Sequence, residues 1–309
     1  MIITGISLGK NGKIYMENSL TGQDVGKYKI GPLLGVGGMG EVYQATDPDG
    51  QIVAIKFLRT DYAGDAGAPA RFIREIRIME ALEHENIMPI KGHGIVNGTT
   101  LYYTMHLING MSLSTLMKRQ QLTPRTAWQV LIQLFRALEY GHSQQVVHRD
   151  VKPDNVFIER RDNKAHVYLG DFGLGKRTGI DNTLTEADSA IGTPHYMSPE
   201  AIMGEKPDPR ADIYSVCVLT YEVLLDKLPF NEEFAHSTAI AHVTKPVPKP
   251  TALNPSFPAA VEAVLLKGLE KKPDNRHQDM GELITAFLNA YDTLSEEELD
   301  TVYRPIKAE

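Results

Sequence analysis

Two kinds of hydrophobic pattern follow one another along this chain of 309 residues. The first is a series of short runs rich in β-branched and aromatic residues, separated by glycine clusters and by an Asp-Pro-Asp-Gly turn at 47–50. Such runs are typical of antiparallel strands. The strands that they predict cover residues 28–34, 41–45, 52–57, 87–91 and 101–107, with a further short candidate at 13–16. Between the third and fourth of the main strands, apolar residues recur at helical spacing, which predicts an amphipathic helix over 71–83.

The second pattern begins after Gly110 and has a helical period. Thr123 and Pro124 are typical of the N-cap and first position of a helix, and an apolar stripe with i, i+3, i+4 spacing continues from there to Gly141. Further helices are predicted at 211–225, 258–269 and 280–291, and a Ser295-x-x-Glu298 capping box indicates a short terminal helix or a tail. Strands first and helices second predict an α+β fold with two lobes.

Composition and charge narrow the class of protein. The chain carries 32 Lys and Arg against 39 Asp and Glu, and its net charge of −7 with both signs mixed argues against a nucleic-acid partner, which would call for a basic patch. Cys217 is the single cysteine, so there is no disulfide framework, and a reducing, cytoplasmic compartment is expected.

The sequence predicts neither a secretory signal nor a membrane-spanning segment. The N-terminus has no basic region followed by a long apolar run, so no secretory signal is expected. The longest apolar stretch, 213–225, contains Tyr221 and Glu222 and is too short to span a bilayer. We therefore expect a soluble chain, while composition leaves open whether it was cut from a membrane-anchored parent.

The densest group of polar residues is His148-Arg149-Asp150-Val151-Lys152-Pro153-Asp154-Asn155, between two apolar segments. Asp150 can accept a proton, Lys152 can hold an anion, and Asn155 can ligate a hard cation. These are the groups that transfer of a phosphoryl group to a hydroxyl needs. A solvated turn with several charges is the alternative, and a nucleotide site elsewhere in the chain would decide between the two.

A glycine-rich segment supplies a candidate nucleotide site. Gly35, Gly37 and Gly40 have the G-x-G-x-x-G spacing, and Val42 onward continues as a strand, so the segment predicts a hairpin rather than the helix start of a dinucleotide fold. The backbone amides of a glycine-rich hairpin can approach phosphates closely. A flexible turn is the alternative.

A lysine follows on the next predicted strand. Lys56 has apolar neighbours and needs a counter-charge, because burying it unpaired would be costly. Glu75, on the helix after this strand, is the candidate partner. An exposed helix carboxylate among Arg71, Arg74 and Arg77 is the alternative reading of Glu75.

With Asp171-Phe172-Gly173 and Ser198-Pro199-Glu200 added, these motifs stand in the order and spacing of the eukaryotic-type (Hanks-type) protein kinase family, which the chain resembles from Tyr28 to about Tyr291. The glycine loop and Lys272-Pro273-x-x-Arg276 are similar to bacterial members, and Lys152 is the serine/threonine form. The resemblance implies a bilobal kinase domain over 27–292. It divides into a small lobe of antiparallel sheet plus one helix (27–108) and a larger, mainly helical lobe (109–292), between an N-terminal extension (1–26) and a C-terminal tail (293–309).

The resemblance also implies a role for each residue of the motifs. Asp150 would orient the substrate hydroxyl and accept its proton, and Lys152 would steady the transferred group. Asn155 and Asp171 would hold Mg²⁺, with Mn²⁺ as an alternative, and Lys56, fixed by Glu75, would bind the α- and β-phosphates of ATP. The residues implied to contact the nucleotide are Leu34, Gly35, Gly37, Gly38, Gly40, Val42, Ala54, Lys56, Met105, His106, Leu107, Phe157 and Asp171.

The same resemblance assigns regulatory and structural residues. Arg149 would receive a phosphate of the activation loop, for which Thr183 and Thr185 are favoured over an unmodified loop. Glu200 and Arg276 would form a buried ion pair that fixes the substrate platform. The remaining implied residues are Asp212 as the buried acid beneath the catalytic loop, His148, Phe172, Met79 and Ile90 as a packed spine, and Thr193 as a platform threonine.

These expectations combine into an ATP- and Mg²⁺-dependent serine/threonine protein kinase that acts on protein substrates. Autophosphorylation of its activation loop would regulate it, with self-association as a route to phosphorylation in trans. A nucleotide-binding pseudokinase or scaffold is the first alternative, and the joint presence of Lys56, Asp150, Asn155 and Asp171 weighs against it. A small-molecule kinase of related fold is disfavoured by Ser198-Pro199-Glu200 and Thr193.

Overall fold

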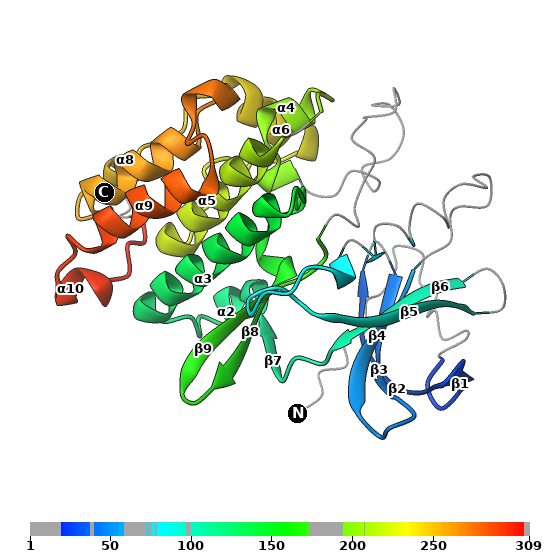
Figure 1. Ribbon diagram of the computed structural model, residues 1–309. Helices are drawn as coiled ribbons and strands as arrows, with labels where there is room; N and C mark the ends of the chain where they lie inside the picture. Colours follow the sequence, from blue (N-terminus) through cyan, green and yellow to red (C-terminus); the bar gives the residue numbers. More distant parts are fainter. Residues whose placement is uncertain are drawn as a thin grey trace. The chain divides into compact units, whose positions relative to one another are not determined.

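The computed structural model describes residues 20–37, 40–58, 73, 76–77, 79–96, 100–172, 194–206 and 208–305 (Figure 1). The chain divides into two compact units. One contains Met1–Pro69 and Ile90–Leu107, and the other contains Ala70–Pro89 and Ile108–Glu309. The residues of the predicted helix over 71–83 thus group with the second unit. Ile73, Ile76, Arg77, Met79 and Glu80, the described residues between 73 and 80, are helical.

The first unit is an antiparallel sheet with the strand order β1-β2-β3-β4-β6-β5. Its strands are β1 (Asp24–Val25), β2 (Tyr28–Gly37), β3 (Gly40–Thr46), β4 (Ile52–Leu58), β5 (Ile90–Val96) and β6 (Thr100–His106). The strands predicted from 28, 41, 52 and 101 are confirmed. The bounds of the strand predicted at 87–91 are wrong, since β5 begins at Ile90 and ends at Val96. Ile87 lies outside β5 and forms an isolated parallel bridge with Leu169.

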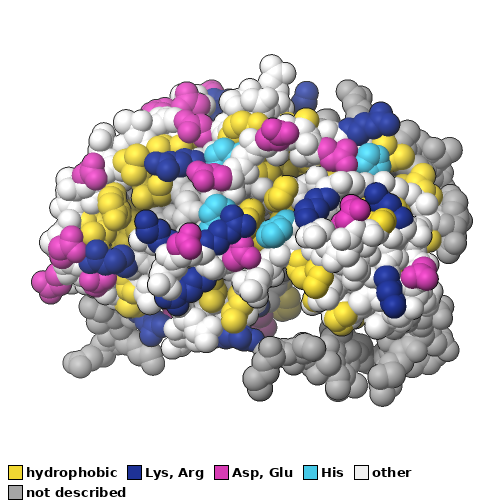
Figure 2. Space-filling model, turned by 60° about the horizontal axis from the view of Figure 1, so that its bottom comes forward, with side chains coloured by type: hydrophobic (Ala, Val, Ile, Leu, Met, Phe, Trp, Pro, Cys, Tyr) yellow, Lys and Arg dark blue, Asp and Glu magenta, His cyan; other side chains and the backbone are white. Residues whose placement is uncertain are grey.

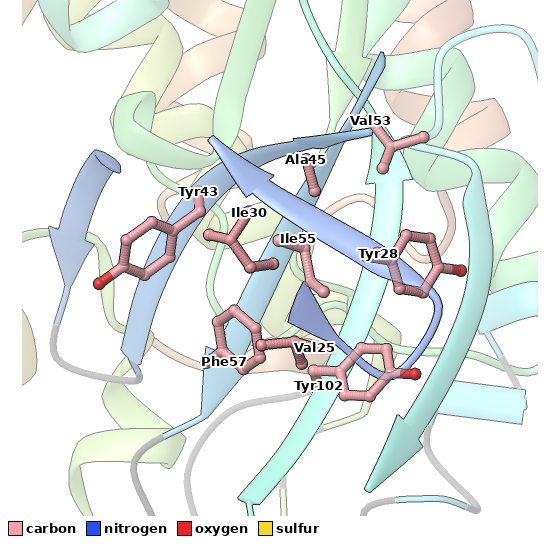
Figure 3. Close-up of a cluster of buried hydrophobic side chains, with 9 residues drawn as sticks. All are labelled: Val25, Tyr28, Ile30, Tyr43, Ala45, Val53, Ile55, Phe57 and Tyr102. Carbon is pink, nitrogen blue, oxygen red and sulfur yellow. The ribbon is translucent and has the colours of Figure 1, made fainter. Parts of the chain in front are cut away.

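One face of this sheet carries the core of the first unit. Nine buried side chains gather there, as Figure 3 shows: Val25, Tyr28, Ile30, Tyr43, Ala45, Val53, Ile55, Phe57 and Tyr102. The aromatic rings meet edge to face, with 5.9 Å between the centroids of Tyr28 and Tyr102 and the same distance between those of Tyr43 and Phe57. Because side chains alternate along a strand, the other face of β4 is left for Ala54 and Lys56.

The second unit is mainly helical. Its helices are α2 (Leu113–Lys118), α3 (Pro124–Ser143), α4 (Pro199–Ile202), α5 (Pro209–Leu225), α6 (Ala235–Thr244), α7 (Pro250–Leu253), α8 (Ala259–Gly268), α9 (Met280–Tyr291) and α10 (Glu296–Leu299). Short 3₁₀ turns are η1 (Pro153–Asn155), η2 (Pro194–Tyr196) and η3 (Pro273–Asn275). Helix α5 is buried over almost its whole length and packs against α3 and α8 (Figure 1). The helices predicted from 124, 211, 258 and 280 are confirmed.

A small antiparallel sheet also belongs to the second unit. It consists of β7 (Gly110–Ser112), β8 (Val156–Arg161) and β9 (Lys164–Leu169) in that order. Asp162 and Asn163 join β8 to β9 with φ angles of 47° and 63°. Positive φ at both central residues is what a two-residue type I′ hairpin requires, and Asp and Asn tolerate it. This hairpin was not predicted, although the Asp-Asn pair was the signal that could have revealed it.

The segment after α9 packs on the helical unit. The predicted capping box is present, since the Ser295 hydroxyl accepts a hydrogen bond from the Glu298 N–H and the Glu298 carboxylate accepts one from the Ser295 N–H. Arg125 on α3 donates to Glu296 and Asp300. Leu299 and Tyr303 are buried, and the Tyr303 ring lies against Phe257 with 5.1 Å between centroids.

Two further observations concern the surface charges and the helices of the described residues. On the face seen in Figure 2, basic and acidic side chains lie among one another. Within the described residues, no helix combines the length and the apolar character that crossing a membrane would require.

Candidate active site

A buried carboxylate on α5 holds the backbone of the predicted catalytic segment. Asp212 is 1% exposed and accepts hydrogen bonds from the N–H of His148 at 2.7 Å and of Arg149 at 2.8 Å. Arg149 has a φ of 66°, a left-handed conformation that costs a residue with a side chain about 1–3 kcal/mol. The two charge-assisted bonds to Asp212 offset this cost and fix the start of the segment.

His142 is a neighbour of Asp212 that the sequence did not single out. Its Nε2 lies 2.8 Å from Asp212 Oδ2, and its side chain is 10% exposed. Asp212 therefore contacts one ring nitrogen and two backbone amides. These three residues lie 70, 64 and 63 positions from Asp212 in the chain. No local pattern points to His142, because its position in the last turn of α3 reads as an ordinary polar helix residue.

The ring of His148 connects the two halves of the candidate site. Its Nδ1 accepts a hydrogen bond from the Asp150 N–H at 3.2 Å, so Nε2 carries the hydrogen and donates to the Gly170 carbonyl at 2.9 Å. The ring also meets Phe172 edge to face, with 4.6 Å between centroids. The loop that carries Asp150 and the loop that carries Asp171 are thus fixed to each other.

Asp150, Lys152 and Asn155 form one hydrogen-bonded cluster. Lys152 Nζ lies 2.6 Å from Asp150 Oδ2, and Asn155 Nδ2 donates to the Asp150 carbonyl at 2.8 Å and to Asp150 Oδ2 at 3.1 Å. The side chains of Asp150 and Lys152 are 24% and 31% exposed. Among the described residues, both side-chain contacts of Asp150 use Oδ2, so Oδ1 is the oxygen that a hydroxyl from solvent or substrate could approach.

Of the two predicted metal ligands, Asn155 belongs to this cluster, and Asp171 follows a residue that is hydrogen-bonded to Asn155. Because Nδ2 of Asn155 is engaged by Asp150, the amide oxygen of Asn155 is the atom that can act as a ligand. Asp171 follows Gly170, whose N–H donates to the Asn155 carbonyl at 2.9 Å, and it has a left-handed φ of 56°. An amide oxygen and a carboxylate suit a hard divalent cation that takes its other ligands from phosphates and water. Among the described residues, no group of three or more His, Cys, Asp or Glu could hold a metal ion alone.

The first unit presents the predicted nucleotide-binding residues on the sheet face opposite its core. Val42 pairs with Lys56 across β3 and β4, and Ala54 pairs with Met105 across β4 and β6. Directly opposed residues of antiparallel strands share a face, so these four side chains form one surface. Lys56 is 7% exposed, and its Nζ lies 5.7 Å from the centroid of the Tyr103 ring.

The glycine-rich segment is a hairpin, as predicted. Gly35 pairs with Val42 and Gly37 with Gly40, at the end of β2 and the start of β3. Leu34 is exposed, His106 ends β6 and is followed by Leu107, and Phe157 lies on β8 of the second unit. Gly38, Glu75, Thr183 and Thr185 lie outside the described residues, as do Thr193 and Gly173.

Glu200 and Arg276 form a fully buried, bidentate ion pair. Nη1 and Nη2 of Arg276 donate to the two carboxylate oxygens at 2.8 and 2.7 Å, and the side chains are 0% and 5% exposed for Arg276 and Glu200. The other N–H groups of Arg276 donate to the carbonyls of Arg210, Glu270 and Lys271. All five donors of this guanidinium are used, and they join α4, the start of α5 and the segment before η3.

Comparison with known proteins places the chain in a family. The family model described as a protein kinase domain matches residues 28–289. The chain belongs to the protein kinase family. The serine/threonine-protein kinase PknH of Mycobacterium bovis is 36% identical over 286 residues, which are 92% of this chain and 47% of PknH. PknE of the same species is 34% identical over 288 residues, which are 93% of this chain and 50% of PknE.

A solved structure supports the same fold. The kinase domain of Mycobacterium tuberculosis PknI superposes with a TM-score of 0.70 at 25% identity, over 88% of this chain and 98% of that domain. The predicted α+β kinase fold and the predicted similarity to bacterial serine/threonine kinases are therefore confirmed. The chain spans about half the length, or less, of these curated relatives.

Proposed function

We propose that this chain is a serine/threonine protein kinase that transfers the γ-phosphoryl group of ATP to serine and threonine hydroxyls of proteins. Members of the family use ATP and a divalent metal in general, and the curated relatives carry the name of serine/threonine-protein kinases. The observation that carries the proposal is the cluster around Asp150, in which Lys152 and Asn155 both contact Oδ2 and leave Oδ1 to receive a hydroxyl.

Each side chain of the cluster has a task in this proposal. Asp150 orients the substrate hydroxyl and accepts its proton, which requires a carboxylate within hydrogen-bond reach of that hydroxyl. Lys152 is about a third exposed, so its ammonium can turn from Asp150 to the transferred group. Asn155 and Asp171 hold the divalent cation, which we infer to be Mg²⁺, with Mn²⁺ as an alternative. Bound there, the cation would neutralise phosphate charge and keep the phosphates in place.

Most of the residues that we propose to bind ATP itself belong to the first unit, while Glu75 and Phe157 belong to the second. Lys56 binds the α- and β-phosphates, with Glu75 as its proposed partner. The backbone of Gly35, Gly37, Gly38 and Gly40 approaches the phosphates without side chains between. We assign the adenine contacts to Leu34, Val42, Ala54, Met105, His106 and Leu107, together with Phe157.

Regulation by phosphorylation is part of the proposal. Arg149 precedes the catalytic Asp150 and is held by Asp212, so a phosphate on Thr183 or Thr185 would meet a cation whose backbone is already fixed. A second copy of the chain would deliver that phosphate in trans.

Intact-mass spectrometry after incubation with ATP and Mg²⁺ tests the proposed function. We expect gains of whole phosphates in the wild type, and none in Asp150→Asn or Lys56→Met. Asp162→Asn is the matched control, because it makes the same substitution in the exposed turn between β8 and β9, where Asn tolerates the positive φ. Binding of ATP without any gain of phosphate by the wild type on itself or on a basic protein substrate would identify a pseudokinase instead.

A further inference from the structure

The outer edge of β9 is completed by side-chain amides at Ala165 and Val167 and by the backbone of residues 86–88 at Leu169. β9 pairs with β8 along one edge, where Ile158 lies opposite Val167 and Arg160 opposite Ala165, and on the other edge Leu169 forms an isolated parallel bridge with Ile87. Alternate residues of a strand turn their backbone N–H and C=O groups to the same edge. The groups of Ala165, Val167 and Leu169 therefore face away from β8, toward α3 (Figure 1).

Gln133 of α3 provides the first part of this edge. Its Oε1 accepts hydrogen bonds from the Val167 N–H and from Asn86 Nδ2, both at 3.0 Å. Its Nε2 donates to the carbonyls of Ala165 at 2.9 Å and of Gln129 at 3.3 Å. The amide thus uses all four of its hydrogen-bonding positions, which makes it selective for one alignment of β9.

Asn86 and its neighbours provide the second part. Asn86 is 1% exposed, and its Nδ2 donates to the Val167 carbonyl at 3.0 Å. Its own carbonyl accepts the Leu169 N–H at 2.8 Å, and the Met88 N–H donates to the Leu169 carbonyl at 2.9 Å. Together with Gln133, these contacts satisfy the outward groups of β9 from the Ala165 carbonyl to the Leu169 carbonyl.

This edge ends next to the residues of the candidate metal site. Leu169 is followed by Gly170, whose N–H donates to the Asn155 carbonyl and whose carbonyl accepts from His148. Asp171 comes next, in its left-handed conformation. A slip of β9 by one residue would turn each side chain to the opposite face and move Asp171 out of place.

We propose that Gln133 and Asn86 are positioning residues that fix the register of β9 and thereby place Asp171 for metal binding. The first half of this inference concerns the fold alone, and the second half rests on the proposed function. Neither residue belongs to the set that we propose to contact the nucleotide, and both would act through the backbone of residues 165–170.

Hydrogen exchange measured by mass spectrometry tests the register. In Gln133→Met, which removes all four amide contacts at similar size, we expect exchange at Val167 and Leu169 to be about tenfold faster or more. Gln129→Met is the matched control, because Gln129 is exposed one turn earlier on α3 and only its backbone carbonyl takes part. Gln133→Glu keeps the acceptor contacts to Val167 and Asn86 and loses the donor contacts, so an intermediate effect is expected. It also serves as the second variant if Gln133→Met folds poorly.

Nucleotide binding with and without Mg²⁺ tests the link to Asp171. We expect Gln133→Met to weaken binding of Mg²⁺-ATP by about three- to tenfold and to leave binding of ATP in EDTA unchanged, since only the metal contact depends on Asp171. Unchanged exchange at Val167 and Leu169 would overturn the inference, and so would an equal loss of binding with and without Mg²⁺. A wild-type chain that binds no Mg²⁺-ATP would overturn both the proposed function and the placing of Asp171 as a ligand, while exchange still decides the register.

Discussion

The Asp150–Lys152 cluster and the Glu200–Arg276 pair each combine a carboxylate with a cation, but we assign them different roles. Both bring a carboxylate and a cation to within 2.6–2.7 Å, yet the side chains of the first are 24% and 31% exposed and those of the second 5% and 0%. All five donors of Arg276 bind acceptors within the protein, whereas the Lys152 ammonium is partly exposed to solvent. Exposure, rather than the identity of the groups, separates the pair to which we assign the chemistry from the pair that holds α4 to the start of α5.

The largest expected effect is on the buried pair. Arg276→Met leaves the Glu200 carboxylate buried without its partner, so we expect the free energy of unfolding to fall by about 3–5 kcal/mol. Urea unfolding followed by circular dichroism measures it. Arg304→Met is the control, because Arg304 and Asp226 form a pair whose side chains are 52% and 50% exposed, worth at most about 1 kcal/mol. Equal losses in the two variants would contradict the comparison.

A buried histidine, linked to the Glu200–Arg276 pair through Tyr214, should make stability depend on pH. His242 of α6 lies 2.9 Å from the Tyr214 hydroxyl, and the Tyr214 ring in turn lies under the Arg276 guanidinium, 4.9 Å away. Burial, and then the nearby charge of Lys271, lowers the pKa of His242 from 6.5 to about 3. Between these values the unfolded chain binds a proton that the folded chain does not, so stability falls as the pH falls from 6.5 toward 3.

The His242→Gln variant measures this effect. It removes the titrating group and retains an acceptor for Tyr214, so we expect it to lose less stability than the wild type between pH 6.5 and pH 4.5, by on the order of 2–3 kcal/mol. Urea unfolding at the two pH values gives the difference. His236→Gln, on the exposed side of the same helix, should behave as the wild type. If the free energy of unfolding of His242→Gln fell with pH as steeply as that of the wild type, burial of His242 would not be the cause of the pH dependence.

For the exposed Asp150–Lys152 cluster, we expect a large effect on activity and a small effect on stability. Lys152→Met is expected to lower kcat for peptide phosphorylation by roughly 10²-fold and to change the free energy of unfolding by less than about 1 kcal/mol. Steady-state kinetics and urea unfolding on the same preparation test both parts. Lys164→Met, at the exposed start of β9, is the control and should change neither. If Lys152→Met lost stability in proportion to its loss of activity, the distinction between the exposed and the buried pair would be wrong.

The smallest effect is expected where a well-formed pair is exposed and distant from the chemistry. The side chains of Arg125 and its partners Glu296 and Asp300 are 42%, 83% and 60% exposed. We expect Arg125→Met to lower the unfolding temperature only slightly, to leave kcat unchanged, and to have a smaller effect in 1 M NaCl. Thermal unfolding at low and high salt measures this. A loss of stability as large as that of Arg276→Met would show that the geometry of the pair outweighs its exposure.

The sequence predicted what local chemistry determines. The start of α3 follows from Thr123, whose hydroxyl accepts the Thr126 N–H at 3.2 Å, and α9 has the predicted bounds because its apolar stripe and its Asp279 cap coincide. Order and spacing of the motifs were enough to indicate the family. The assignment of individual site residues remains a prediction, because the nucleotide that would test it is a partner outside the chain.

What the sequence did not predict depends on contacts between distant segments. Asn86 bonds to the Val167 carbonyl across 81 positions, and His142 meets Asp212 across 70. Nothing near either residue marks it as special. The wrong bounds predicted for the strand at 87–91 have the same origin. Ile87 pairs with the distant Leu169 instead of joining the larger sheet.

The packing of Tyr303 matters to anyone who prepares this domain on its own. The family match ends at residue 289, yet the Tyr303 side chain is 1% exposed, rests on Phe257, and its hydroxyl donates to the Glu298 carbonyl. The Arg304 carbonyl accepts a hydrogen bond from Asn254 Nδ2 at 3.0 Å. An expression boundary drawn at the family border would therefore uncover an aromatic surface and leave a buried amide without its acceptor, and a boundary at or beyond residue 305 would keep both covered.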